Sequence, residues 1–113
     1  MEDCLFCKFV NKEFETKIVY EDDNMIIIND INPKAPVHML LIPKVHYKYL
    51  HEQNANEAKL LGLCLNKLAS LRCELGLSDG YRLVINQGDQ AGQTVPHLHV
   101  HILAGKNMNW NPA

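Results

Sequence analysis

Three histidines at alternate positions, His97, His99 and His101, constrain this chain more than any other feature of its sequence. They lie in the otherwise apolar run 98–103 and just before it, which predicts a β-strand. Side chains two positions apart on a strand share a face, so we expect all three imidazoles on one face. The outer two would be roughly 13 Å apart at about 3.3 Å per residue, too far for one tetrahedral metal ion to bind all three. The row can therefore be structural at one end and reactive at the other.

Imidazoles held on a strand suit chemistry at phosphorus. A neutral imidazole is a good nucleophile at pH 7, and a neighbouring one can donate a proton or bind phosphate oxygens. A glycine-bearing loop, residues 87–94, precedes the row and can offer backbone N–H groups to a phosphate. One or two histidines can be placed by chance, but three at alternate positions in a chain with six histidines favour a functional site.

The rest of the chain predicts an α+β fold. Short apolar runs typical of strands occupy residues 17–20, 25–28, 38–42, 82–86 and 98–103. One long helix is expected after Asn54, which can form a capping box with Glu57, and Gly76 is the expected stop. Short connections favour antiparallel pairing. We therefore expect a five-stranded, mostly antiparallel sheet with one long helix on a face.

The predicted helix has a wide apolar face. The residues expected to point at the core are Leu61, Cys64, Leu65, Leu68, Leu71 and Leu75. Leu60 and Leu63 widen this face in its first half. Two interpretations stay open: a generous core stripe, or a helix that also packs against a second subunit.

Bulk composition bounds the class of protein. With 113 residues we expect one domain, residues 1–113, and 47% hydrophobic with 21% charged residues is typical of a soluble globular protein. A net charge of −2 argues against a nucleic-acid partner, and no apolar stretch approaches the ~20 residues of a membrane span. The acidic N-terminus lacks a signal-peptide pattern, so we expect an intracellular protein with reduced cysteines. Cys4 and Cys7 then indicate thiol or metal chemistry before a disulfide.

Residues 97–103 match the His-φ-His-φ-His-φ-φ pattern, with φ apolar, of the histidine triad (HIT) superfamily. Further segments resemble the nucleotide-pocket segment, the Ile-Pro-Lys segment, the Gly-Gln-Ser-Val phosphate loop and the C-terminal Met-x-Trp signature of that family; they are residues 29–38, 41–46, 92–95 and 108–110. The chain most resembles the histidine triad nucleotide-binding proteins, also called protein kinase C-interacting proteins, in a zinc-bearing variant. The resemblance implies the HIT fold with a short N-terminal helix, and a homodimer with a continuous sheet.

The resemblance also implies a mechanism. His99 would attack the α-phosphorus of a nucleoside phosphoramidate, an amine would leave, and water would release the nucleoside monophosphate from a nucleotidyl-histidine intermediate. His101 and His38 would contact phosphate and assist proton transfer.

Binding roles follow from the same resemblance. Asn86 and Thr94 would hold phosphate oxygens, with Gly92 and Gln93 in the same loop, and Asp30 would bind the ribose hydroxyls. The apolar slot for the base would contain Phe6, Phe9, Ile28, Ile31 and Leu40. Trp110 would reach toward the partner's site. Ordinary loop polarity is the alternative for Asn86 and Thr94, and plain core packing is the alternative for the apolar residues.

The zinc-bearing relatives imply a metal site here. They combine an N-terminal Cys-x-x-Cys with a histidine after the Ile-Pro-Lys segment and with the first histidine of the triad. In this chain those residues are Cys4, Cys7, His46 and His97. The site would be closed and structural. The alternative is two free thiols.

The leading interpretation is a hydrolase, a purine nucleoside phosphoramidase of the adenosine 5′-monophosphoramidase type. The alternatives are a dinucleoside polyphosphate hydrolase, a nucleotide-binding scaffold or regulatory protein with weak catalysis, and a zinc module without catalysis. The last of these leaves His99, His101 and Asp30 without a role. We expect AMP-like ligands, regulatory protein partners, no nucleic acid and no membrane, and a cytoplasmic location with the nucleus as an additional site.

Overall fold

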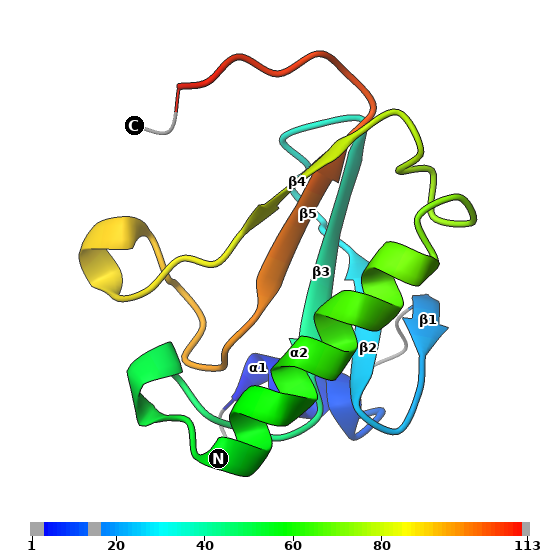
Figure 1. The fold of residues 1–113 in the computed structure, drawn as a ribbon. Coiled ribbons are helices and arrows are strands. Elements are labelled where there is room, and N and C mark those ends of the chain that lie inside the picture. Colours follow the sequence, from blue (N-terminus) through cyan, green and yellow to red (C-terminus); the bar gives the residue numbers. More distant parts are fainter. Residues whose placement is uncertain (1–3, 14–16, 112–113) are drawn as a thin grey trace.

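The computed structural model describes residues 4–13 and 17–111 of the chain. A five-stranded sheet in the order β1-β2-β3-β5-β4 forms its centre, and all neighbouring strands pair antiparallel (Figure 1). The strands are β1 (Ile18–Glu21), β2 (Met25–Asn29), β3 (Val37–Pro43), β4 (Tyr81–Val84) and β5 (Val100–Ala104). This confirms the predicted α+β fold with a five-stranded antiparallel sheet.

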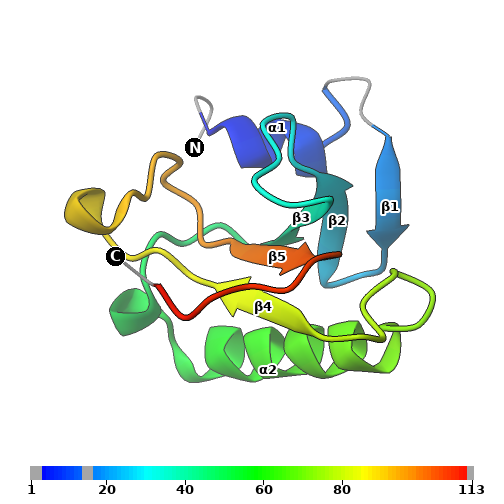
Figure 2. The ribbon, with the colours of Figure 1, turned by 90° about the horizontal axis from the view of Figure 1, so that it is seen from above.

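Helices cover the two faces of the sheet. The long helix α2 (Ala55–Ser70) lies along one face and the short helix α1 (Leu5–Val10) lies on the other (Figure 2). Two short 3₁₀ turns, η1 (Leu50–Glu52) and η2 (Asp89–Ala91), lie in the connecting loops. Because both faces are covered, residues 25–28 of β2 are all buried and alternate between an α2-side and an α1-side core. The short N-terminal helix is confirmed.

The predicted start of α2 agrees with the structure, but its predicted end does not. Asn54 accepts a hydrogen bond from the backbone of Glu57, and the Glu57 side chain accepts one from the Asn54 N–H, so the predicted capping box is confirmed. The predicted end at Gly76 is wrong, because α2 ends at Ser70 and a series of turns follows. Gly76 has φ 78° and stops those turns instead: the Leu77 N–H reaches back to the Arg72 carbonyl at 2.8 Å.

The histidine row enters the sheet later than predicted. β5 begins at Val100, so a strand from residue 98 is wrong at its start. The Leu98 N–H donates to the Tyr47 carbonyl at 2.7 Å, and Pro96 lies just upstream, so this stretch has left the sheet ladder. The alternation of faces nevertheless persists. Leu98 and Val100 belong to the α2-side core, and the Phe6 ring on the α1 side packs against His99.

Other strand boundaries shift by one or two residues. β4 covers Tyr81–Val84, so Asn86, predicted inside a strand, lies in the loop that follows. Within the described residues, no helix has both the length and the apolar character that crossing a bilayer requires. Residues 1–3, which contributed to the expectation about a signal peptide, lie outside the described residues.

Candidate active site and metal centre

Four potential metal ligands meet at one end of the histidine row. Cys4 is the N-cap of α1, Cys7 lies in its first turn, His46 follows β3, and His97 precedes β5. Their ligand atoms all lie within 4.8 Å of one another. From His97 Nδ1 the distances are 3.5 Å to Cys4 Sγ, 3.6 Å to Cys7 Sγ and 3.2 Å to His46 Nδ1. Tetrahedral zinc with ordinary bond lengths separates sulfur from nitrogen by about 3.6 Å and two nitrogens by about 3.4 Å. The four residues therefore fit a zinc ion.

The orientation of His97 supports the same fit. Its Nε2–H donates to the Pro43 carbonyl at 2.7 Å, which leaves Nδ1 unprotonated and directed at the thiols. Metal-binding histidines typically hold their second nitrogen in this way. Burial lowers the pKa of His97 to about 4, so the imidazole is neutral at pH 7. Burial and the neighbouring Cys4 raise the pKa of Cys7 to about 11, and a bound cation would favour the thiolate.

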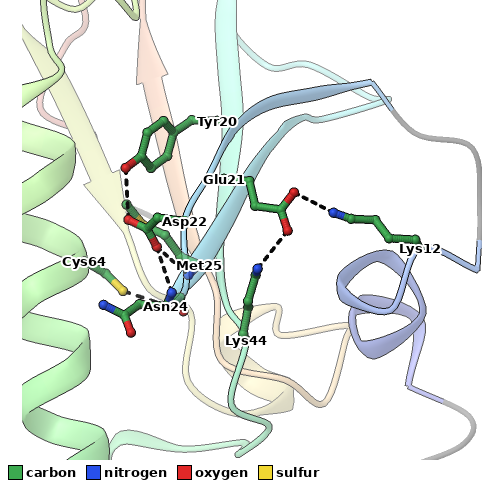
Figure 3. Close-up of polar contacts among 8 residues, drawn as sticks. All are labelled: Lys12, Tyr20, Glu21, Asp22, Asn24, Met25, Lys44 and Cys64. Atoms are coloured by element: carbon green, nitrogen blue, oxygen red, sulfur yellow. Dashed lines mark hydrogen bonds and ion pairs between the residues drawn. The ribbon is translucent and has the colours of Figure 1, made fainter.

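A surface ion-pair network joins the two segments that carry these ligands. The Glu21 carboxylate on β1 pairs with Lys12, just after α1, and with Lys44, just after β3 (Figure 3). The same figure shows Asp22 closing the β1–β2 hairpin by accepting from the N–H groups of Asn24 and Met25. The hairpin thereby ties the chain next to Cys7 to the chain next to His46, although exposed pairs such as these contribute little each.

His99 has one ring nitrogen held and the other left with a lone pair. Its Nδ1–H donates to the His97 carbonyl at 2.7 Å, so Nε2 is the unprotonated nitrogen of the neutral ring. The Phe6 ring packs edge-on against it at 4.7 Å, and only 6% of the residue is exposed. Burial lowers the pKa of His99, with the hydrogen bond to His97 acting against it. The result is a neutral imidazole with a fixed nucleophilic nitrogen.

A chain of hydrogen bonds sets the tautomers of the other two imidazoles. The Lys34 N–H donates to His38 Nδ1 at 2.9 Å, so the His38 proton is on Nε2. That nitrogen lies 3.0 Å from His101 Nδ1 and 3.3 Å from an Asp30 carboxylate oxygen. When His38 donates to His101, the proton of His101 is on its own Nε2. His101 is thereby prepared to donate to a ligand.

Burial favours the neutral form of His101 as well. It lowers the pKa of His101, and charge on His99 or His38 would lower it further, while Asp30 acts in the opposite direction. The rings of His99 and His101 have their centroids 5.1 Å apart. A lone-pair nitrogen and an N–H donor are therefore side by side, the combination that nucleophilic attack and leaving-group protonation need.

A cavity of about 560 Å³ opens beside His38 and His101, and the buried His99 is not among the residues that line it. Five predicted site residues line it: Asp30, His38, Asn86, Thr94 and His101. They come from the end of β2, from β3, from the two loops that flank the 3₁₀ turn η2, and from β5. The cavity therefore brings together a carboxylate, two imidazoles, an amide and a hydroxyl, which suit a sugar and a phosphate.

Comparison with known proteins agrees with this geometry. A model of the HIT domain matches residues 11–108 of the chain. The chain belongs to the HIT family. An uncharacterised HIT-like protein of Synechocystis is 46% identical over 111 residues, which cover 98% of this chain and 97% of that protein. The 14 kDa zinc-binding protein of Brassica juncea is 41% identical over 112 residues, or 97% of this chain and 99% of that protein.

A solved HIT structure is equally close. The HIT family hydrolase of Legionella pneumophila superposes with a TM-score of 0.91 at 41% identity, and the match covers 98% of this chain and 100% of that one. Family membership, predicted from the triad and its companion segments, is confirmed.

The residues predicted to form the base slot lie mainly in the core under α1. Phe6, Ile28 and Leu40 are buried in one cluster, with Phe9 half-buried against it. Ile31 is different, because 92% of it is exposed beside Asp30 in the chain. These side chains pack as a core in this structure, and the cavity over His101 is lined by other residues.

The remaining predicted residues occupy the loop and the C-terminal segment. Gln93 braces its own loop by accepting from the Gly88 N–H and donating to the Lys48 carbonyl. Gly92 has φ 88° and ends η2, and its exposure leaves it accessible. Trp110 is 83% exposed, with its ring 6.0 Å from the Arg82 guanidinium.

Four residues that line the cavity were missed by the sequence reasoning: Asn32, Lys34, Val84 and Leu103. The backbone N–H of Lys34 matters most, since it sets the tautomer of His38. Strand register places Val84 opposite His101 and Leu103 opposite His38. Asn32 and Lys34 lie in residues 29–38, which resemble the nucleotide-pocket segment, whereas only the pairing of strands could have identified Val84 and Leu103.

Proposed function

We propose that this HIT protein is a zinc-bearing purine nucleoside phosphoramidase of the nucleotide-binding branch, and a hydrolase that releases nucleoside 5′-monophosphate. The observation that carries the proposal is the His99 imidazole, whose Nδ1–H is held by the His97 carbonyl and whose Nε2 keeps its lone pair beside the His101 donor. A closed zinc module without catalysis would have no use for this arrangement.

In the first step, His99 Nε2 attacks the α-phosphorus and forms a P–N bond to the enzyme. The bond from phosphorus to the leaving amine breaks, and the amine takes a proton from the Nε2–H of His101. The Nε2–H of His38 donates to His101 Nδ1 during this step. In the second step, water attacks phosphorus and the His99–P bond breaks. The water proton returns to His101, and the net reaction adds one water to give nucleoside monophosphate and free amine.

The substrate would be held on both sides of phosphorus. Asn86 and Thr94 line the cavity with His101 and would donate to phosphate oxygens. Asp30 would accept from the ribose hydroxyls through charge-assisted hydrogen bonds. The base would lie over Ile31 and remove its exposed surface from water. Beneath it would lie the apolar residues Phe6, Phe9, Ile28 and Leu40. Gly92 and Gln93 would shape the phosphate loop.

Zinc would be held by Cys4, Cys7, His46 and His97 and would serve as a structural cross-link between α1 and the segments that flank β3 and β5. With four protein ligands, the ion has no open position for water. Its effect on the reaction is therefore indirect, through the His97 carbonyl that orients His99.

A homodimer joined through β4 accompanies the proposal. β4 is an edge strand of the described sheet, and Leu83 on it is 39% exposed. Leu63 on α2 is a second large apolar side chain that is exposed, at 48%. Pairing of β4 with its copy would satisfy the free edge and continue the sheet. Sedimentation of the purified protein tests this, and a monomer at all concentrations would contradict it.

The decisive experiment is a substrate panel. Adenosine and guanosine 5′-phosphoramidates are compared with diadenosine polyphosphates, with His99→Asn as the blank. We expect turnover of the phosphoramidates to dominate and a covalent nucleotidyl adduct to be detected by intact-mass measurement after rapid quench. Preference for the polyphosphates would replace this function with the alternative hydrolase, and nucleotide binding without turnover of any substrate would favour a nucleotide-binding scaffold.

A further inference from the structure

A second cavity adjoins the catalytic one. Its volume is about 290 Å³, and Lys34 and Leu103 line both spaces, so the two adjoin. Arg82, Lys106 and Asn107 continue the second cavity toward the C-terminal segment. The mechanism assigns no role to this space or to its cations.

The charge of the second cavity is one-sided. Lys34, Arg82 and Lys106 line it, and among the described residues that do so none is acidic. Three cations converging on a concave surface raise the local concentration of anions.

The fold brings the cations together by a close backbone contact. β3 and β5 pair so that Val37 lies opposite Ala104, and Gly105 then continues against Pro36. A Cβ on Gly105 would be 2.9 Å from Pro36 Cβ, and Gly105 has φ 93°, so glycine is required twice over. This contact sets the Lys34 loop beside the Lys106 loop.

Strand register places the second cavity on the catalytic face. Arg82 lies opposite Leu103, and Leu103 lies opposite His38, so these three side chains share the face of the imidazoles. Leu103 is two residues beyond His101, roughly 6.6 Å further at about 3.3 Å per residue. The order along this face is therefore His99, then His101, then the cationic cavity.

That order matches the geometry of in-line displacement. Attack from His99 on a phosphorus held at His101 expels the leaving group on the opposite side, toward Leu103 and Arg82. Asp30, the proposed ribose contact, follows β2, whereas Arg82 is on β4, and β3 with β5 separate the two. The nucleoside would thus lie toward β2 and the leaving group toward β4.

We propose that the cavity of Lys34, Arg82 and Lys106 binds an anionic group, carboxylate or phosphate, on the amine that leaves. This rests on the proposed function and specifies its substrate class as phosphoramidates of acidic amines. Arg82 is held for this role, because its Nη2–H donates to the Asn109 carbonyl at 2.9 Å. That bond uses one of the five N–H groups of the guanidinium, and the others would donate to the anion.

The test compares matched leaving groups. Adenosine 5′-phosphoramidates of β-alanine, of neutral β-alanine amide and of O-phosphoethanolamine are assayed for kcat/KM. We expect the wild-type protein to prefer the β-alanine acid over its amide by roughly 5-fold or more, the size of a partly exposed ion pair. The preference should shrink as salt rises from about 0.01 M to about 0.5 M. The O-phosphoethanolamine substrate shows whether phosphate or carboxylate is the better anion.

Charge-removing variants locate the effect. Lys34→Gln, Arg82→Gln, Lys106→Gln and the triple variant should bring the acid-to-amide ratio progressively toward 1, and the ratio cancels any general change in activity. Lys59→Gln on α2, across the sheet, is the matched control and should keep the wild-type ratio.

The outcomes separate the two proposals. Hydrolysis of acid and amide at equal kcat/KM, or a ratio that survives in the triple variant, overturns the anion cavity while leaving the phosphoramidase intact. Failure to hydrolyse any of the three substrates overturns the proposed function, and the anion cavity with it.

Discussion

The two ends of the histidine row contain the same side chain in opposite situations. His97 is fully buried, faces two thiols and a second imidazole, and has its other nitrogen held by a carbonyl. His101 is half-buried, lies against His38, and lines a cavity of about 560 Å³. The closed end has a full set of ligands and no room for substrate, whereas the open end has donors and space. Surroundings, and not residue type, divide the row into a metal centre and a reactive centre.

His99 lies between these ends and belongs to both. Its backbone neighbour His97 supplies the carbonyl that holds Nδ1, so order at the closed end is transmitted to the nucleophile by one hydrogen bond of 2.7 Å. Its Nε2 belongs to the open end. Separate perturbation of the two ends should therefore give different signatures.

The largest effect is expected for His99→Ala. Removal of the nucleophile should lower kcat by about 10⁴-fold or more, as is typical for loss of a covalent catalyst. Zinc content should change little, since the residue is not among the four metal ligands, whereas the melting temperature should fall because a buried side chain that packs against Phe6 is removed. Phosphoramidate turnover, metal analysis and thermal unfolding measure the three quantities. Retained turnover would remove His99 from the mechanism.

The next effect is expected at the closed end. Cys7→Ser should abolish stoichiometric zinc binding and lower the free energy of unfolding by on the order of 2–5 kcal/mol, because the ion links α1 to the rest of the chain. Metal analysis and denaturant unfolding measure the change. Cys73→Ser, at an exposed cysteine beyond α2, is the matched control and should alter neither. Equal zinc content in the Cys7 variant would refute the four-ligand site.

A smaller effect is expected within the open end. His38→Gln should lower kcat by about 10²-fold, because His101 loses the partner that sets its tautomer while the nucleophile stays in place. Steady-state kinetics measure this, with His51→Gln at an exposed histidine as the control. Unchanged kcat in the His38 variant would show that the hydrogen bond between the two imidazoles is dispensable.

A smaller effect is expected on the pH dependence of the reaction, whose acid limb should move to lower pH. Burial lowers the pKa of His101, with His99 and His38 adding to the shift and Asp30 opposing it. Burial also lowers the pKa of His99, whose neutral form is the nucleophile. The acid limb of kcat/KM should therefore have its midpoint below the ordinary histidine value of about 6.5. The wild-type profile measures this directly. A midpoint above that value would show that Asp30 dominates the environment.

The sequence predicted the features that follow from local rules. The alternation of side chains placed the imidazoles on one face even at His97 and His99, which precede β5. Side chains of an extended chain alternate in direction whether or not the chain is paired in a sheet. The capping box at Asn54 and Glu57 needs only four residues and was predicted in full. Gly76 was recognised as a stop, but Ser70 ends the helix, since turns between them satisfy the backbone in another way.

The missed features depend on register and loop contacts. Lys34, Arg82 and Lys106 are far apart in the chain and share no pattern, and they meet because Val37 and Tyr81 both pair with Ala104. The base slot shows the converse. Apolar composition at Phe6, Ile28 and Leu40 cannot separate a binding slot from a core, so these residues form a buried cluster and their role in base binding stays a prediction.

The smallest expected effect comes from a pair of glycines. Gly105→Ala adds a methyl group that meets Pro36 at 2.9 Å on a backbone with φ 93°, so we expect destabilisation by about 1–2 kcal/mol. Gly62→Ala, inside α2 with nothing within 4 Å, should instead stabilise by about 0.5–1 kcal/mol. Because Gly105 lies at the open end, its variant should weaken discrimination among leaving groups while zinc content stays constant. Thermal unfolding, metal analysis and the acid-to-amide ratio measure all three. Loss of zinc in Gly105→Ala would show that the open end of the histidine row also controls the metal centre through β5.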